Sequence, residues 1–112
     1  MVQQMIADNE IDIAASRGLI LQACGELDQG RSGAQSTAIA KTFTAEAVWR
    51  VVDRSLQICG SLGISGEVLL SRFLREVRPF RIYDGPSETH RWTIARRVVR
   101  RHLDARPAGA RP

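Results

Sequence analysis

Residues 36–59, STAIAKTFTAEAVWRVVDRSLQIC, carry the pattern that decides the fold. Apolar side chains recur every three to four positions on one broad stripe, and charged side chains fall mostly off it, which is typical of a long amphipathic helix. The stripe consists of Ile39, Phe43, Ala47, Val48, Val51, Val52, Leu56 and Cys59, and the charges off it are Lys41, Glu46, Arg50 and Asp53.

The segment before this stripe predicts another long helix, over residues 2–28. Gly30 and Gly33 end its pattern and leave a short link, so the two helices should form an antiparallel hairpin whose shared face is the core. At about 1.5 Å per residue the first helix would reach roughly 40 Å, which favours a bundle with neighbours over a compact monomer. Its apolar residues at helical spacing are Met5, Ile6, Ile13, Ile20, Leu21, Cys24 and Leu27.

Two shorter helices are predicted after residue 60. The first covers residues 67–77, begins after a turn at Ser65 and Gly66, and stops at Pro79. The second begins at Pro86, which suits a first helical turn, and runs to Leu103. Phe80, Ile82 and Tyr83 between them should be extended or irregular. The sequence therefore predicts an all-α fold, a bundle of four helices of which two are long and antiparallel, one is short and one is C-terminal.

Length and composition indicate one small domain. The chain has 112 residues, 44% of them hydrophobic, and we assign residues 1–105 to the helical domain and 106–112 to a flexible basic tail. A chain of this size buries only about two-thirds of its unfolded surface, so wide apolar stripes need a partner to cover them. We therefore expect a homo-oligomer or a hetero-oligomer.

The cysteines and the hydropathy pattern suggest a cytoplasmic protein. Cys24 and Cys59 form no spaced framework, no signal segment opens the chain, and we expect reduced thiols. No apolar run approaches the roughly 18 residues that a membrane span needs, so no transmembrane segment is predicted.

The net charge of +4 comes largely from the C-terminal arginines. They could bind nucleic acid, although aromatic stacking residues, a zinc framework and a helix-turn-helix pattern are missing. The alternative is a solvated helix face with a frayed end. The arginines are Arg91, Arg96, Arg97, Arg100, Arg101, Arg106 and Arg111.

The histidines give no catalytic or metal-binding pattern. His90 and His102 lack a Cys or carboxylate at ligand spacing, so no metal site is predicted. Ser87 and His90 lack a third member that would orient them as nucleophile and base.

Two turns interrupt the helical sequence, and each has a purely structural interpretation. Gly60 and Gly63 follow a long apolar pattern where a left-handed helix C-cap is favoured. The run Asp84-Gly85-Pro86-Ser87 suits a turn and a helix start, since Asp and Ser favour caps and an acid there complements the helix dipole.

As an ordered set, these turns resemble the C-terminal domain of acyl-CoA dehydrogenases. The resemblance covers nearly the whole chain and rests on Gln57-Ile-Cys-Gly-Ser-Leu-Gly63, Arg75-Glu76 and the run RIYDGPSETHR at residues 81–91, with ELDQG at residues 26–30 and AIAK at residues 38–41 in the expected order. It implies part of a flavoenzyme, without the N-terminal helical domain, the central β domain and one additional helix of the C-terminal domain.

The resemblance implies a function that needs these other parts. It is FAD-dependent α,β-dehydrogenation of an acyl-CoA, with the missing domains supplied by a partner chain. The alternative is a noncatalytic helical module that kept the oligomerisation surface and lost flavin chemistry. Departures from the family pattern at Ser61, Pro86 and Glu88 motivate that alternative.

For the cofactor, the resemblance implies contacts from Gln57, Gly60, Ser61 and Gly63 to the adenine and pyrophosphate side of FAD, usually FAD bound to a neighbouring subunit. Glycine suits such a turn because no Cβ obstructs close backbone approach. Ser61 stands where a second glycine is common in the family. Glu88 stands where the family often has a flavin-contacting glutamine.

For the substrate, the resemblance implies that Asp84 takes the place of the glutamate that removes the α-proton. Its backbone N–H would polarise the thioester carbonyl, and Tyr83 and Gly85 would border the substrate. Aspartate is one methylene shorter than glutamate, so its reach is reduced. An unperturbed aspartate, with a pKa near about 3.9, is a weak base, and an apolar pocket would have to raise that pKa.

Overall fold

The computed structural model describes residues 1–106, and every regular element in that range is helical. The longer helices are α1 (Val2–Asp28), α2 (Ala34–Cys59), α4 (Leu70–Val77) and α5 (Ser87–Asp104). One-turn elements are α3 (Ser61–Ile64) and the 3₁₀ helix η1 (Arg78–Arg81). The predicted all-α fold with four main helices is confirmed, and α3 is an addition to it. Of the expected basic tail, only Arg106 falls inside the described residues.

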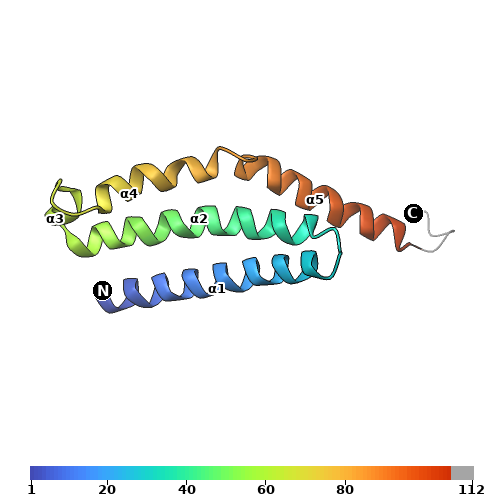
Figure 1. Cartoon of the computed structure of the whole chain (residues 1–112), viewed down its shortest axis with the longest axis horizontal. Helices are drawn as coiled ribbons and strands as arrows, with labels where there is room; N and C mark the ends of the chain where they lie inside the picture. Colours follow the sequence, from blue (N-terminus) through green and yellow to red (C-terminus); the bar gives the residue numbers. More distant parts are fainter. Residues whose placement is uncertain (107–112) are drawn as a thin grey trace.

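The helices lie side by side in a single layer, with α2 in the middle (Figure 1). On one edge of α2 the antiparallel helix α1 runs along its whole length, and on the other edge α4 and α5 follow one another. The molecule measures 65 × 35 × 26 Å. A layer this thin leaves both of its broad faces open to other polypeptide.

The link between α1 and α2 depends on two glycines. Gly30 and Gly33 have φ angles of +71° and +56°, a region that favours glycine. A Cβ on Gly33 would also lie 2.8 Å from Leu27 Cδ2. The predicted antiparallel hairpin therefore forms where the glycine pattern placed it.

The face of α1 that packs on α2 is not the predicted apolar stripe. The buried residues of α1 are Asp12, Ser16 and Ala23, while the stripe is largely exposed, with Ile20 at 43% and Leu27 at 52%. Small residues are buried on more than one side of α2, and Ala40 and Thr44 border the same cavity as Ala23 of α1. The buried alanines of α2 are Ala38, Ala40, Ala45 and Ala47.

A charged cluster ties α1 to α2. Asp12 accepts hydrogen bonds from Arg50 Nε at 3.0 Å and from Arg54 Nη1 at 2.8 Å, and Arg50 Nη2 binds its other oxygen. The hydrogen bond from Arg50 is the largest effect on the carboxyl and, against the opposing effect of burial, the two arginines lower the pKa of Asp12 to about 2. We call Asp12, Arg50 and Arg54 the hairpin ion cluster.

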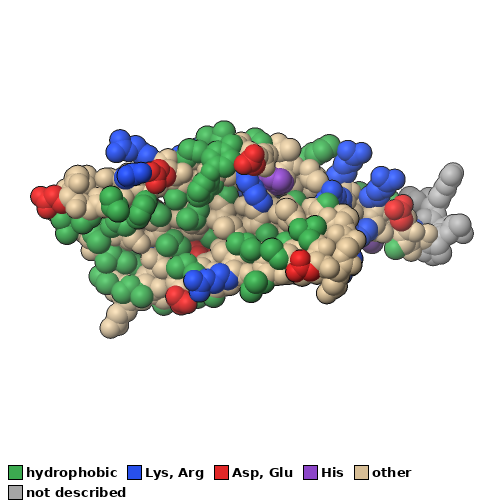
Figure 2. Space-filling view, in the orientation of Figure 1, with side chains coloured by type: hydrophobic (Ala, Val, Ile, Leu, Met, Phe, Trp, Pro, Cys, Tyr) green, Lys and Arg blue, Asp and Glu red, His purple; other side chains and the backbone are tan. Residues whose placement is uncertain are grey.

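The apolar core is small and lies between α2 and α4. Val52, Leu56 and Val77 form its buried part. Eighteen large hydrophobic side chains remain exposed in the described residues, and apolar patches are visible on the surface in Figure 2. Exposed apolar surface of this extent marks interaction sites. No helix in residues 1–106 combines the length and apolar character that a membrane crossing requires.

Two boundaries after α2 differ from the predictions. Helix α4 begins at Leu70 rather than at residue 67, because Ser65 Oγ accepts the Glu67 N–H at 3.2 Å and holds the chain in a turn. Pro79 does not end helical structure, and Phe80 is not extended. Proline fixes φ near the helical value and fits an early position, so η1 continues the helical path to Arg81.

Candidate functional site

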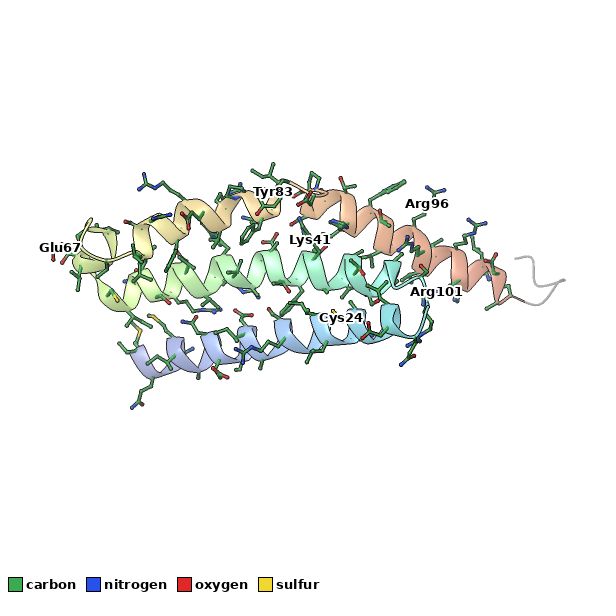
Figure 3. All side chains as sticks on the ribbon, in the orientation of Figure 1. Cys24, Lys41, Glu67, Tyr83, Arg96 and Arg101 are labelled. Atoms are coloured by element: carbon green, nitrogen blue, oxygen red, sulfur yellow. The ribbon has the colours of Figure 1, made fainter. Side chains whose placement is uncertain are left out.

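A loop of residues 82–86 joins η1 to α5, and Lys41 of α2 binds its backbone. The Lys41 ammonium donates to three carbonyl oxygens, those of Phe80 at 2.7 Å, Tyr83 at 3.0 Å and Gly85 at 2.8 Å. Figure 3 shows Lys41 directed from α2 toward the segment that carries Tyr83. All three N–H groups of the ammonium are used, so one side chain fixes the path of the loop.

Glu46 fixes the two ends of the same loop. Its Oε1 accepts from Arg81 Nε and from Ser87 Oγ, both at 3.0 Å, and Arg91 Nη2 lies 3.6 Å away. Ser87 is only 1% exposed. Burial acts to raise the pKa of Glu46, but the hydrogen bonds from Arg81 and Ser87 and the nearby guanidinium charges lower it further, so the net shift is downward.

Inside the loop, Asp84 and Gly85 adopt left-handed backbone conformations, with φ of +53° and +88°. Asp tolerates this region better than Glu, because its short polar side chain suits it. The Asp84 carbonyl lies 3.1 Å from His90 Nε2, and a Cβ on Gly85 would come within 2.5 Å of that nitrogen. The Asp84 side chain is exposed, as is Tyr83, whose ring packs edge-on against Phe80 at 5.6 Å.

The turn of residues 57–63 lies at the far end of α2. Gly60 is the helix C-cap with φ +57°, and an added Cβ there would meet no atom within 4 Å. The C-cap interpretation therefore holds for Gly60, and its open Cα surface leaves room for another molecule. Gln57 and Ser61 beside it are exposed. This accessible glycine turn is compatible with the nucleotide part of FAD.

Gly63 has a different environment from Gly60. It is buried, and a Cβ there would lie 2.8 Å from the backbone oxygen of Leu56. Glycine at this position lets α3 pack directly on the end of α2. Close helix packing accounts for this residue without any ligand.

The predicted site residues thus form two groups. Tyr83, Asp84, Gly85 and Glu88 share the loop and the first turn of α5, whereas Gln57, Gly60, Ser61 and Gly63 share the turn after α2. Lys41 contacts the loop and so gives its position along α2. It precedes Gly60 by nineteen positions. At about 1.5 Å per residue the groups are therefore about 28 Å apart along α2. One copy presents them at separate places.

Sequence reasoning missed the two residues that position the loop. Lys41 and Glu46 were assigned to the polar side of their helix, and Lys41 also belonged to the AIAK run of the resemblance, but neither was predicted to contact the loop. The available signal was composition, because Lys41 is the sole lysine among 16 basic residues. Among residues 1–106, no three His, Cys, Asp or Glu side chains are grouped to hold a metal ion.

The family model for "Acyl-CoA dehydrogenase, C-terminal domain" matches residues 1–99. The chain belongs to the acyl-CoA dehydrogenase family. A curated relative, cyclohexane-1-carbonyl-CoA dehydrogenase from Geobacter metallireducens, is 30% identical over 100 residues, which are 89% of this chain and 26% of the relative. The chain therefore spans about a quarter of the length of this acyl-CoA dehydrogenase.

Solved structures agree with this membership. The FAD complex of PigA matches 89% of this chain and 26% of its own length, with a TM-score of 0.85 and 26% identity. A putative acyl-CoA dehydrogenase from Mycobacterium abscessus matches 89% of this chain and 25% of its own, with a TM-score of 0.85 and 29% identity. The helical layer is thus the C-terminal domain fold of acyl-CoA dehydrogenases, and a solved relative of the same fold binds FAD.

The hold of Lys41 on the loop is directly testable. Replacing Lys41 with Met keeps the length of the side chain but removes the three hydrogen bonds, so we expect amide hydrogen exchange in residues 82–86 to rise about tenfold or more. Helix content should stay the same. Exchange measured by mass spectrometry checks this, and Arg17→Met, an exposed cation on α1, is the control. Unchanged exchange in the loop of the Lys41 variant would refute the role.

Proposed function

We propose that this chain is the C-terminal part of an acyl-CoA dehydrogenase-like flavoenzyme. It supports FAD-dependent α,β-dehydrogenation of an acyl-CoA together with domains that other polypeptide supplies. The observation that carries the proposal is the loop of residues 82–86, in which Lys41 and Glu46 hold the backbone and leave the Asp84 carboxylate directed outward. Rigid support for an exposed carboxylate is what a positioned proton acceptor requires.

On the substrate side, two groups of Asp84 have complementary roles. Its carboxylate takes the proton from the α-carbon, and its backbone N–H donates to the thioester oxygen, where negative charge develops. That N–H has no hydrogen-bond acceptor within residues 1–106 and is therefore available to a substrate. Tyr83, exposed beside it, borders the acyl group.

On the cofactor side, the exposed turn formed by Gln57, Gly60 and Ser61 contacts the nucleotide part of FAD. When bound, FAD accepts the hydride from the β-carbon. This turn and Asp84 are about 28 Å apart along α2, too far to contact the same end of one FAD molecule. The separation supports an assembly in which the turn contacts FAD held by a neighbouring subunit. The exposed apolar side chains of α1 and α5 are available for that assembly.

Visible spectroscopy of the purified protein tests the proposal. The chain is prepared alone and co-expressed with a candidate partner from a neighbouring reading frame, and we expect flavin absorbance nearly stoichiometric with the complex. Gln57→Glu places a negative charge beside the pyrophosphate and should reduce retained flavin severalfold. Gln29→Glu, the same change at the exposed C-cap of α1, should leave it unchanged. A colourless complex overturns the flavoenzyme function.

A second function is favoured by the exposed apolar surface. The eighteen exposed large hydrophobic side chains and the small core suit a noncatalytic oligomerisation module of the same family. Such a module would form a defined complex without bound flavin. A stable colourless assembly in the same experiment would therefore support it.

A further inference from the structure

Three successive carbonyl groups of the loop of residues 82–86 are held from two sides. The carbonyls of Tyr83 and Gly85 accept hydrogen bonds from the Lys41 ammonium on α2, at 3.0 Å and 2.8 Å. The carbonyl between them, that of Asp84, lies 3.1 Å from Nε2 of His90 on α5. A carbonyl oxygen can only accept, so Nε2 carries the proton in this contact. Lys41 therefore holds the two outer carbonyls, and His90 holds the middle one.

The two peptide groups that flank residue 84 determine the direction of its side chain. The Tyr83 carbonyl belongs to the planar group that contains the Asp84 N–H, and the Asp84 carbonyl belongs to the next planar group. When both planes are held, φ and ψ of residue 84 are fixed, and the Cα–Cβ bond has one direction. Lys41 does not bind the carbonyl of the second plane, whereas His90 does. The direction of the carboxylate therefore depends on His90.

The backbone of Asp84 needs such a restraint. Among residues 1–106, Asp84 is the only non-glycine residue with a positive φ, at +53°. This left-handed conformation is unfavourable for a residue with a Cβ, and it persists where the surrounding contacts determine it. Rotation about ψ of Asp84 would carry its carbonyl away from Nε2 of His90. The hydrogen bond from His90 thus stabilises the conformation that directs the carboxylate outward.

Gly85 leaves the space that the His90 ring occupies. A Cβ on Gly85 would lie 2.5 Å from Nε2 and 3.1 Å from Cε1 of His90. Any side chain at residue 85 would therefore displace the imidazole. Glycine at this position serves the contact between His90 and the Asp84 carbonyl as well as the turn itself, where its φ is +88°.

His90 is itself mounted on a fixed helix start. Its main-chain N–H donates to the Pro86 carbonyl at 3.1 Å and so closes the first turn of α5. Ser87, the first residue of α5, is 1% exposed and donates to Glu46 of α2 at 3.0 Å. Figure 1 shows α5 beginning beside α2. The partly buried imidazole therefore projects to the loop from a helix end that α2 anchors.

We propose that His90 is a positioning residue that orients the Asp84 carboxylate toward the acyl-CoA. It acts through the carbonyl of Asp84, and it neither contacts the substrate nor takes up its proton. This role rests on the proposed function, in which Asp84 is the base. Loss of the hydrogen bond lowers the rate of α-proton removal, because the carboxylate then spends less time in the productive direction.

Nuclear magnetic resonance of the full chain measures the positioning without flavin or substrate. His90→Met removes the donor, whereas His90→Gln places an amide N–H at a similar reach. We expect the amide order parameters of Asp84 and Gly85 to be about 0.85, to fall below about 0.6 in His90→Met and to recover in His90→Gln. The matched control is His102→Met, which changes an exposed histidine of the same helix. Circular dichroism confirms that each variant is folded.

Stopped-flow bleaching of the flavin in the assembled complex measures the effect on the reaction. His90→Met should lower the limiting rate by about tenfold or more and keep the flavin colour. The half-saturating acyl-CoA concentration should stay within about twofold, because the loop borders only the reacting end of the substrate. His90→Gln should recover most of the rate. A purely structural role would instead reduce retained flavin in His90→Met.

Three outcomes in a complex that is coloured and bleached when unchanged would overturn the role of His90 alone. They are unchanged order parameters and rates in His90→Met, an equal loss in His90→Met and His90→Gln, and a loss confined to the half-saturating concentration. The second assigns His90 to filling space, and the third assigns it to substrate binding. If the unchanged complex is colourless or is not bleached, the proposed function fails and the role of His90 fails with it.

Discussion

Replacing Asp12 with Asn, which keeps the shape of the side chain and removes its charge, should destabilise the chain by about 2 kcal/mol. This is the largest loss of stability that we expect from a single isosteric substitution. The variant leaves Arg50 and Arg54, one turn apart on α2, facing α1 without a counter-charge. Removing one partner of a fully buried ion pair costs about 3–5 kcal/mol. The arginine side chains here are 40% and 24% exposed, so solvent screens part of that cost.

The same cluster predicts a pH dependence. Because the folded pKa of Asp12, about 2, lies below the ordinary value of 3.8, the folded state binds the proton more weakly than the unfolded state. The stabilising contribution of Asp12 is therefore complete above about pH 4 and is lost as the pH falls toward 2. In Asp12→Asn this part of the acid dependence should disappear.

Thermal unfolding at fixed protein concentration measures both effects. A loss of about 2 kcal/mol should lower the Tm by about 10 °C for a domain of this size. Asp53→Asn removes the same charge from an exposed position of α2 without an ion pair in residues 1–106, and it should shift the Tm little. Equal melting temperatures for the two variants, or a preserved acid transition in Asp12→Asn, would contradict the assigned role.

Replacing Asp84 with Asn should lower kcat of the assembled flavoenzyme by about 10³-fold while its flavin colour remains. General-base catalysis contributes about 10²–10⁴ in rate, and the amide cannot take up the α-proton. Asn is preferable to Ala here because it tolerates the left-handed backbone of residue 84. The backbone N–H that would contact the thioester is therefore kept, and the loss reports on the carboxylate.

Acyl-CoA-dependent bleaching of the flavin in stopped flow measures the chemical step directly. Glu67→Gln, an exposed carboxylate at the α3 end of the molecule and away from the Asp84 loop (Figure 3), should leave the rate unchanged. Asp84→Glu keeps a carboxylate at this position, and its rate should therefore lie between those of Asp84→Asn and the unchanged chain. Bleaching at the normal rate in Asp84→Asn would exclude Asp84 as the base, and loss of colour would assign it to cofactor binding instead.

The sequence predicted the helices better than the way they pack. Period and glycine punctuation placed α1 from Val2 to Asp28, because both are local properties of the chain. The prediction of which face of α1 is buried was wrong. Periodicity shows which residues share a helix face, but it does not show which face packs against a neighbouring helix. Asp12 is buried because two arginines on another helix neutralise it, and no local pattern encodes that pairing.

The support of the Asp84 loop was beyond sequence reasoning for a similar reason. Lys41 binds carbonyls 39 to 44 positions further along the chain. Glu46 binds the side chains of Arg81 and Ser87, which are 35 and 41 positions further along. Backbone carbonyls carry no side-chain identity, so a lysine that binds three of them leaves no sequence motif. The position of the carboxylate was accessible from family resemblance, whereas the atoms that hold it required the structure.

The central place of α2 also has a consequence for the order of folding. The hairpin of α1 and α2 is joined by a five-residue link, so its contacts can close early, while the chain is still being synthesised. The opposite edge of α2 must wait for α4 and α5, which are synthesised after the hairpin. Lys41 and Glu46 meet their partners only after the ribosome has added the residues up to Arg91. The Asp84 carboxylate is thus positioned only after the hairpin can form, and a chain truncated before residue 84 would keep the hairpin without it.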